Sequence, residues 1–387
     1  MVWVNRVRRR VRLFALFSLL IAVTAIATAG LVTERETGTH DPYSLECLPF
    51  HPPSSVAALN RMVATYRSVP GFVGADVGAD VTLQDERSIW VFGDTIRTPD
   101  FEGQRFVRNS MLLLRRTGCS SVVIPADHGA VIPDRADGVG YWPMDLAAVH
   151  RDGYDLVGVT LQRVHTTGAG IFDFEILGPA LALFRVPVGR TPELLFVRDL
   201  GKDDPDPERP MWGAAVETNG DDLYLYGTSR PRDNSTFGWS LRVARVRILD
   251  LLDHRKWRYW DGAHWQLRPG RAAALIPAIG GVSEVLSVFQ RNGSWYAVSK
   301  RDEFLGTDLV IWKAPAPTGP FVASAPLAKI PSNSEGGLLR YMPLAHPDLL
   351  PADDSVVVSY SRNVADLQRL LKDPDLYRPR FLQVPLP

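Results

Sequence analysis

The stretch W-G-A-A-V-E-T-N-G-D-D-L-Y-L-Y-G-T, residues 212–228, contains two short strand patterns on either side of an Asn-Gly turn. Asn219 and Gly220 can adopt the positive φ angles that a tight hairpin turn requires. The second half alternates leucine with tyrosine, and residues of this kind are enriched in strands. The stretch therefore predicts a β-hairpin with strands at 212–218 and 223–228.

Four further segments beyond residue 70 repeat this pattern of an apolar strand, a polar turn and a second strand rich in aromatic and β-branched residues. The copies are spaced about 60 to 70 residues apart, which leaves room for two more strands in each unit. Repeated four-stranded units of this kind stack radially as propeller blades. The other predicted hairpins are 76–94, 142–160, 284–300 and 346–361, and third strands are expected at 181–186, 241–246 and 309–312.

Composition agrees with an all-β fold, because 10 Trp, 31 Gly and 30 Pro are typical of many short strands joined by turns. Helical periodicity is limited to residues 56–66 and 364–371. A β-sandwich is the structural alternative, but five equivalent hairpins suit it less well. We predict a five-bladed β-propeller over 70–387, preceded by a linker and N-terminal extension over 33–69 and by a signal or transmembrane segment over 1–32.

The N-terminal segment has the features of a targeting signal. Five arginines between residues 6 and 12 precede an uncharged run over 13–32, and a bilayer core requires roughly 20 apolar residues. Positive charge before the run keeps the N-terminus in the cytoplasm and directs the rest of the chain outward. Ala27-Thr28-Ala29 has the form of a signal-peptidase site. We expect an extracytoplasmic protein, either secreted or anchored to the plasma membrane by this segment.

Charge and cysteine content exclude several classes of protein. Basic and acidic residues balance at 43 each, so nucleic acid is not an expected partner. Cys47 and Cys119 can form one disulfide in an exported chain, but a pair of cysteines is neither a disulfide framework nor a metal site. The histidines show no metal-ligand spacing. We expect no metal, no cofactor and a monomeric protein.

Hairpin geometry places a group of polar residues at one mouth of the central channel. The start of each first strand lies beside the end of its second strand, opposite the turn, and propeller ligands commonly bind at such a mouth. By the same reasoning Asp152, Glu217, Asp221 and Asp353 lie near turns at the far face, as solvated residues. The mouth residues read from the five hairpins are Asp76, Asp94, Trp142, Asp145, Trp212, Arg230, Glu284, Lys300, His346, Arg362 and Asn363.

These residue types suit a carbohydrate. Aromatic rings stack on sugar faces and charged groups bind hydroxyls. Glycoside cleavage typically requires two carboxyl groups, one protonated as the acid and one ionised, and crowding of carboxylates raises the pKa of at least one. We take Asp76, Asp94 and Glu284 as candidate catalytic residues and the other eight mouth residues as candidate substrate-binding residues.

Two motifs in the first hairpin carry a resemblance to a known family. G-A-D-V-G (74–78) and W-V-F-G-D-T (90–95), followed in order by R-N-S (108–110) and later motifs as far as V-S-Y-S-R-N (358–363), resemble a family of secreted actinobacterial proteins long labelled a domain of unknown function. The resemblance implies a five-bladed propeller, because members of that family have this fold. Some of them are endo-D-arabinanases that cut the D-arabinan of mycobacterial-type cell envelopes.

The resemblance also implies that Asp76 and Asp94 occupy the paired-aspartate positions of the family. One departure is Asp80, a second aspartate where the family more often has a small or aromatic residue after its first D-x-G. We therefore expect a glycoside hydrolase that acts on arabinofuranose-containing cell-envelope polysaccharide. The alternative is a non-catalytic propeller that binds glycans or serves as an envelope scaffold.

Overall fold

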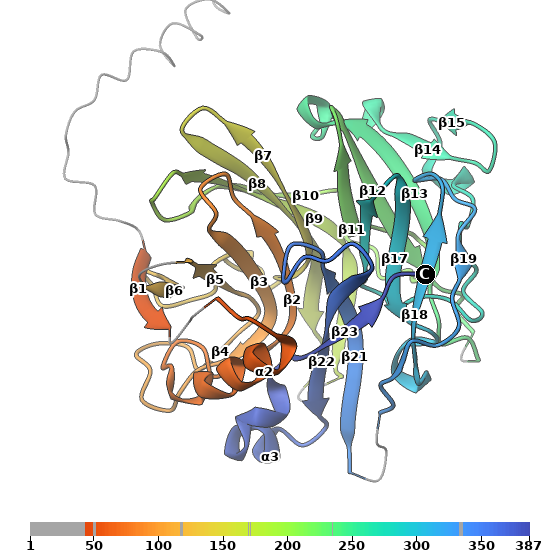
Figure 1. Ribbon diagram of the computed structural model, residues 1–387. Coiled ribbons are helices and arrows are strands. Elements are labelled where there is room, and N and C mark those ends of the chain that lie inside the picture. The colour runs from red at the N-terminus through yellow and green to blue at the C-terminus, as the bar shows by residue number, and fades with distance from the viewer. Residues whose placement is uncertain are drawn as a thin grey trace, which may run out of the picture. The chain divides into compact units, whose positions relative to one another are not determined.

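Five antiparallel sheets make up the described part of the chain (Figure 1). The structure is a computed structural model, and it describes residues 43–48, 52–116, 119–168, 170, 172–233, 235–332 and 336–387. The first sheet runs outward through β2 (Gly74–Thr82), β3 (Ser88–Ile96), β5 (Ser110–Leu114), β6 (Ser120–Pro125) and β1 (Tyr43–Leu48), with β4 (Phe106–Val107) paired to β3. The second runs through β7 (Gly140–Arg151), β8 (Tyr154–Thr166), β9 (Phe174–Pro187) and β10 (Glu193–Asp199).

The remaining three sheets follow the same outward order. The third contains β11 (Met211–Asn219), β12 (Asp222–Ser229), β13 (Ser240–Arg247), β14 (Arg258–Trp260) and β15 (Trp265–Gln266). The fourth contains β16 (Ser287–Arg291), β17 (Ser294–Lys300), β18 (Asp308–Ala314), β19 (Val322–Ala323) and β20 (Ala328–Lys329). The fifth contains β21 (Leu338–His346), β22 (Ser355–Val364) and β23 (Arg380–Pro385). The expected third strands lie within β9, β13 and β18.

Helices in the described chain are short and lie between strands. The α-helices are α2 (Val56–Ala64) and α3 (Leu367–Lys372). The 3-10 segments are η1 (Thr65–Ser68), η2 (Ile248–Asp250), η3 (His254–Lys256), η4 (Pro269–Arg271), η5 (Glu303–Leu305) and η6 (Pro374–Tyr377).

The innermost strands form a closed ring. β2 contacts β7, β7 contacts β11, β11 contacts β16, β16 contacts β21, and β21 returns to β2. Apolar side chains fill the space between neighbouring sheets, and one buried cluster extends across the first four of them and includes Leu344 of the fifth. The predicted all-β, five-bladed propeller is confirmed.

Turn chemistry explains the hairpins. At the turn between β16 and β17, Asn292 has a φ of 50° and Gly293 a φ of 75°, so both lie in the left-handed region that a type I′ turn requires. Gly220, between β11 and β12, has a φ of 62°. The Asn-Gly signals in the sequence therefore identify real turns.

Four of the five innermost strands contain a β-bulge near the mouth. Register shifts occur at Ala75/Val77 in β2, Pro143/Asp145 in β7, Trp212/Ala215 in β11 and Tyr341/Leu344 in β21. A bulge bends a strand and changes the direction in which its side chains point, and bulges are frequent beside active sites. The repeated bulge therefore shapes the mouth of the channel.

The fifth hairpin differs from its prediction. Its first strand is β21 at Leu338–His346, so His346 ends the inner strand beside the turn, far from the mouth. The sequence pattern gave the wrong bounds for this strand because Arg340 and Pro343 interrupt the apolar residues of β21. Proline is nevertheless tolerated at a bulge. The prediction that His346 lies at the mouth is wrong.

The first and fifth sheets close the ring through side chains. Among the described residues, no sheet combines strands from both ends of the chain. Instead, His346 Nδ1 lies 2.5 Å from Asp80 Oδ1 and His346 Nε2 lies 2.8 Å from Ser359 Oγ. The amide of Val77 also donates to Ser361 Oγ across this junction. His346 is therefore a structural residue of the ring closure.

We predict that His346→Leu lowers the free energy of unfolding by about 1–3 kcal/mol, because it leaves the buried Asp80 and Ser359 without their partner. Chemical denaturation measures the change. His165, which is exposed, provides the control, and His165→Leu should leave the stability unchanged. Equal stability of the two variants would contradict the structural role of His346.

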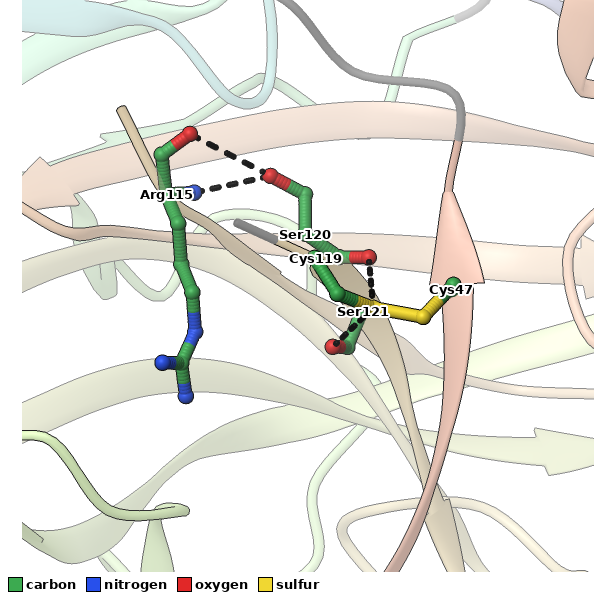
Figure 2. Close-up of a disulfide and its surroundings, with 5 residues drawn as sticks. All are labelled: Cys47, Arg115, Cys119, Ser120 and Ser121. Atoms are coloured by element: carbon green, nitrogen blue, oxygen red, sulfur yellow. Dashed lines mark hydrogen bonds between the residues drawn. A yellow bond between two sulfur atoms is a disulfide. The ribbon is translucent and has the colours of Figure 1, made fainter. Parts of the chain in front are cut away.

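The N-terminal extension contributes to the first sheet. β1 pairs with β6, and Cys47 in β1 forms a disulfide with Cys119, which precedes β6 (Figure 2). The disulfide joins residues 72 positions apart, and the hydroxyl of Ser120 next to it bonds to the backbone of Arg115. It therefore fastens the outermost strand of the first sheet.

We predict that Cys47→Ser/Cys119→Ser lowers the free energy of unfolding by about 2–4 kcal/mol, because the disulfide restricts the unfolded chain. For the wild type, denaturant titrations before and after reduction of the disulfide should show the same loss of unfolding free energy. The double variant should not respond to reductant, and a wild type that is equally stable after reduction would contradict the prediction.

The predicted signal or transmembrane segment, residues 1–32, lies outside the described residues. Among the residues that the structure does describe, no helix is long and apolar enough to cross a membrane.

Candidate functional site

The candidate site is centred on Asp76 of β2 and Asp94 of β3. The two strands pair at Ala75 and Thr95, and the backbone N–H of Asp94 donates to the Asp76 carboxylate. Gly93 makes this approach possible, because a Cβ atom at that position would lie 2.4 Å from Asp76 Oδ1. The Asp76 carboxylate therefore lies across the neighbouring strand, next to Asp94.

Asp76 is held by two tyrosines. Tyr341 of β21 donates its hydroxyl to Asp76 Oδ2 at 2.7 Å, and the hydroxyl of Tyr377 in η6 also bonds to this carboxylate. Asn363 Nδ2 lies 3.4 Å from the Tyr341 hydroxyl. The fifth blade thus orients the first member of the aspartate pair.

Asp94 faces the second blade. Trp142 of β7 donates Nε1–H to Asp94 Oδ1 at 2.6 Å. Arg108 and Asp134 are close enough to affect the charge of Asp94. Gly140 leaves room for Arg108, whose Cδ would lie 1.9 Å from a Cβ atom at that position.

The surroundings of the two carboxyls differ. Burial raises the pKa of Asp76, whereas the hydroxyls of Tyr341 and Tyr377 lower it by bonding to the ionised form. Burial raises the pKa of Asp94, the adjacent Asp76 charge raises it further, and the Trp142 bond lowers it. Asp94 is therefore the member that keeps its proton at higher pH.

Glu284 lies between β15 and β16 and approaches the second and third blades. Its carboxylate interacts with the Gln162 side chain of β8 and with the charges of Arg230 and Glu303. Burial and then the Glu303 charge raise the pKa of Glu284 to about 7. Gln162 is the cross-strand partner of Trp142, which bonds to Asp94. This pairing links Glu284 to the mouth that contains the aspartate pair.

Asp145 of β7 is bound to the backbone of two strands. Its carboxylate accepts N–H bonds from Leu146 and from Val216 of the next blade, and burial raises its pKa to about 7. Glu217 of β11, predicted as a solvated turn residue, is half-buried. Its pKa is raised to about 8 by burial and by the charges of Asp145 and Asp348. The prediction for Glu217 is wrong because its side chain faces other carboxylates.

Three other predicted mouth residues have different surroundings. Trp212 is only 8% exposed and packs at 5.1 Å from the Tyr259 ring inside the third blade. Lys300 is fully buried and its ammonium donates to the Arg340 carbonyl at 2.6 Å, and burial lowers its pKa to about 8. Arg362 is half-buried and lies opposite Arg340 in β21. The structure does not place these three residues beside the aspartate pair.

Tyr341, Tyr377 and Gln162 are site residues that sequence reasoning missed. Tyr341 would have been found if the fifth hairpin had been placed at 338–364, because it lies near the start of β21. Arg108 begins the R-N-S motif and could have been found there. Tyr377 and Gln162 had no local signal. Among the described residues, no group of three or more His, Cys, Asp or Glu side chains is arranged to hold a metal ion.

We predict opposite shifts of the Asp94 pKa in two variants. Asp76→Asn should lower it, because the neighbouring negative charge is removed, whereas Trp142→Phe should raise it, because the bond to the ionised carboxylate is lost. Carboxyl ¹³C NMR titration measures both shifts, with the exposed Asp353 as an internal control. An Asp94 pKa that is unchanged in both variants would contradict the arrangement.

Comparison with known proteins places the chain among propellers. One similar crystal structure is that of a protein from Bacteroides ovatus ATCC 8483, provisionally described as a hydrolase. It has a TM-score of 0.63 at 18% sequence identity, and the match covers 88% of this chain and 94% of that protein. This similarity shows the fold.

Two further solved structures are less similar to this chain. An α-L-arabinofuranosidase from Fusarium graminearum has a TM-score of 0.43 at 14% identity, covering 87% of this chain and 85% of its own. An α-L-arabinanase from Penicillium chrysogenum has a TM-score of 0.41 at 12% identity, covering 83% and 82%. No curated protein matches the chain. The family model described as Domain of unknown function (DUF5005) matches residues 61–385, and the chain belongs to this family.

Proposed function

We propose that this protein is a glycoside hydrolase with Asp76 and Asp94 as its catalytic carboxyl groups. The observation that carries the proposal is the pair itself, two adjacent carboxyls in different hydrogen-bonding surroundings. Two tyrosine hydroxyls stabilise the ionised form of Asp76, whereas burial and the Asp76 charge favour the protonated form of Asp94. Pairs whose pKa values are separated by their surroundings are typical of acid–base sites.

The two aspartates have different roles in the proposed reaction. Asp94 donates its proton to the glycosidic oxygen as the bond from that oxygen to the anomeric carbon breaks. Water then adds its hydroxyl to the anomeric carbon, and the remaining proton of water returns to the Asp94 carboxylate. The ionised Asp76 supplies negative charge against the positive charge that develops on the sugar. The rate should fall in acid, where Asp76 gains a proton, and in base, where Asp94 loses its proton.

The other groups near the pair suit a sugar substrate. Glu284 is our proposed third carboxyl, with Arg230 beside it. Trp142 and Asn363 contact the aspartate pair directly and through Tyr341, respectively. Charged and amide groups of this kind bind sugar hydroxyls, and an indole ring offers an apolar face to a sugar ring.

We further propose an arabinofuranose-containing cell-envelope polysaccharide as the substrate. The support is the sequence resemblance of the motifs around Asp76 and Asp94. The Cys47–Cys119 disulfide supports a location outside the cytoplasm, because disulfides persist in oxidising compartments. The basic and apolar N-terminal residues support export with cleavage or membrane anchoring.

Asp76→Asn and Asp94→Asn should each reduce the hydrolysis of arabinan by at least about 10²–10⁴-fold, because each removes a group that transfers a proton or stabilises the transition state. The melting temperatures should change little, since asparagine retains a hydrogen-bonding oxygen. The exposed turn variant Asp353→Asn is the control and should keep full activity. The assay measures oligosaccharides released from arabinogalactan and lipoarabinomannan. A wild type that binds arabinan and releases nothing would show a glycan-binding propeller instead.

A further inference from the structure

A polar pocket of about 380 Å³ lies beside the aspartate pair, on the outer side of Asp94. Its lining includes Arg108 and Asp134, whose charges act on the Asp94 carboxyl in addition to that of Asp76. β4 forms another part of the lining, and it pairs with β3 at Thr95, the residue that follows Asp94. The pocket and the proposed acid are therefore neighbours.

Two buried side chains build the pocket. Arg97, which is 1% exposed, donates to the carbonyls of Gln104, His128 and Gly129, and so joins the two loops that form its walls. Asn109, also 1% exposed, holds a third segment by donating to the Ile132 carbonyl and accepting from the Ile132 amide. Hydrogen bonds from buried side chains to the backbone of loops hold those loops in place. The shape of the pocket is therefore built into the fold.

The lining combines one exposed aromatic ring with polar groups. Phe106 on β4 is 46% exposed, which is unusual for phenylalanine because burial of its ring is favourable. Gln104, Arg108 and Asp127 lie around the same pocket. An apolar ring face together with hydrogen-bonding groups is the chemistry that recognises a sugar ring, whereas a purely apolar ligand would not use the polar groups. The volume lies within the range of about 300–1,000 Å³ that is usual for small-molecule sites.

We propose that this pocket binds the leaving-group side of a glycan chain, with the Phe106 ring against a sugar face. The inference rests on the proposed function, because it is the proton donated by Asp94 that places the leaving group on this side. The chain then extends from the channel mouth across the first blade.

Binding to an inactive protein tests the pocket independently of catalysis. Titration calorimetry on Asp76→Asn measures the affinity for an arabinan oligosaccharide, with and without Phe106→Ala. Loss of a half-exposed phenylalanine should weaken binding by about tenfold. Phe106→Tyr, which keeps the ring, should restore the affinity, and a merely structural role would not give this rescue. Leu249→Ala is the control, because Leu249 is 83% exposed on η2 at the far end of the third blade.

Kinetic measurements on the same variants in the active protein distinguish a role in substrate binding from a role in the chemical step. Phe106→Ala should reduce kcat/KM about tenfold on the oligosaccharide and leave the hydrolysis of arabinofuranosyl fluoride unchanged, because fluoride is too small a leaving group to contact Phe106. Equal affinity of Phe106→Ala and Leu249→Ala, or no binding of the oligosaccharide, would overturn the pocket proposal. Binding that depends on Phe106 in a wild type that hydrolyses nothing would uphold the pocket and overturn the hydrolase.

Discussion

The junction between the first and fifth blades is the constraint on which the rest of the structure depends. Each described sheet comes from its own part of the chain, so apolar packing and hydrogen bonds between the two blades must hold the ring closed. Asp80, His346 and Ser359 form one buried set of contacts there. A buried hydrogen-bonded group is costly to leave unpaired, so such contacts favour one alignment of the two blades.

The chain reinforces the same junction from outside the ring of inner strands. Asn60 of α2 exchanges two hydrogen bonds with the backbone of Phe381 in β23. Arg378, which is buried, donates to the carbonyl of Val73 just before β2. These contacts join residues about 300 positions apart in the chain, and Figure 1 shows α2 close to β22 and β23. The N-terminal extension therefore acts as part of the closure.

The candidate site uses this junction. Tyr341 and Tyr377 belong to the fifth blade and its following segment, while the carboxylate that they hold belongs to the first blade. Closure of the ring therefore also sets the hydrogen bonds of Asp76. Lys300 acts similarly between the fourth and fifth blades, where its buried ammonium bonds to the Arg340 carbonyl.

Several carboxyl groups of the inner hairpins lie in buried surroundings. Asp76, Asp94, Asp145, Glu217 and Glu284 all have raised pKa values, with burial as the first cause. Burial of charge is unfavourable without compensating partners, so this arrangement is difficult to explain by stability alone. Carboxyl groups with pKa values perturbed in this way are more typical of functional sites.

Local sequence signals were sufficient to predict the fold and to identify Asp76 and Asp94. Asn-Gly and Asp-Gly turns with alternating apolar strands identified the hairpins because turn geometry and strand periodicity depend on neighbouring residues. Asp76 and Asp94 were found because they end the two strands of one hairpin. His346 was misplaced because a bulge with Pro343 conceals the true extent of β21.

Only the tertiary structure identified the partners from other blades. Tyr341, Tyr377 and Gln162 approach the carboxyl groups across blade interfaces, and Trp212 turns into the core instead of the mouth. The sequence by itself therefore determined which strands pair and where each hairpin exposes its polar ends. The contacts between blades, and with them the order of the Asp76 and Asp94 pKa values, arise from long-range packing that no local pattern encodes.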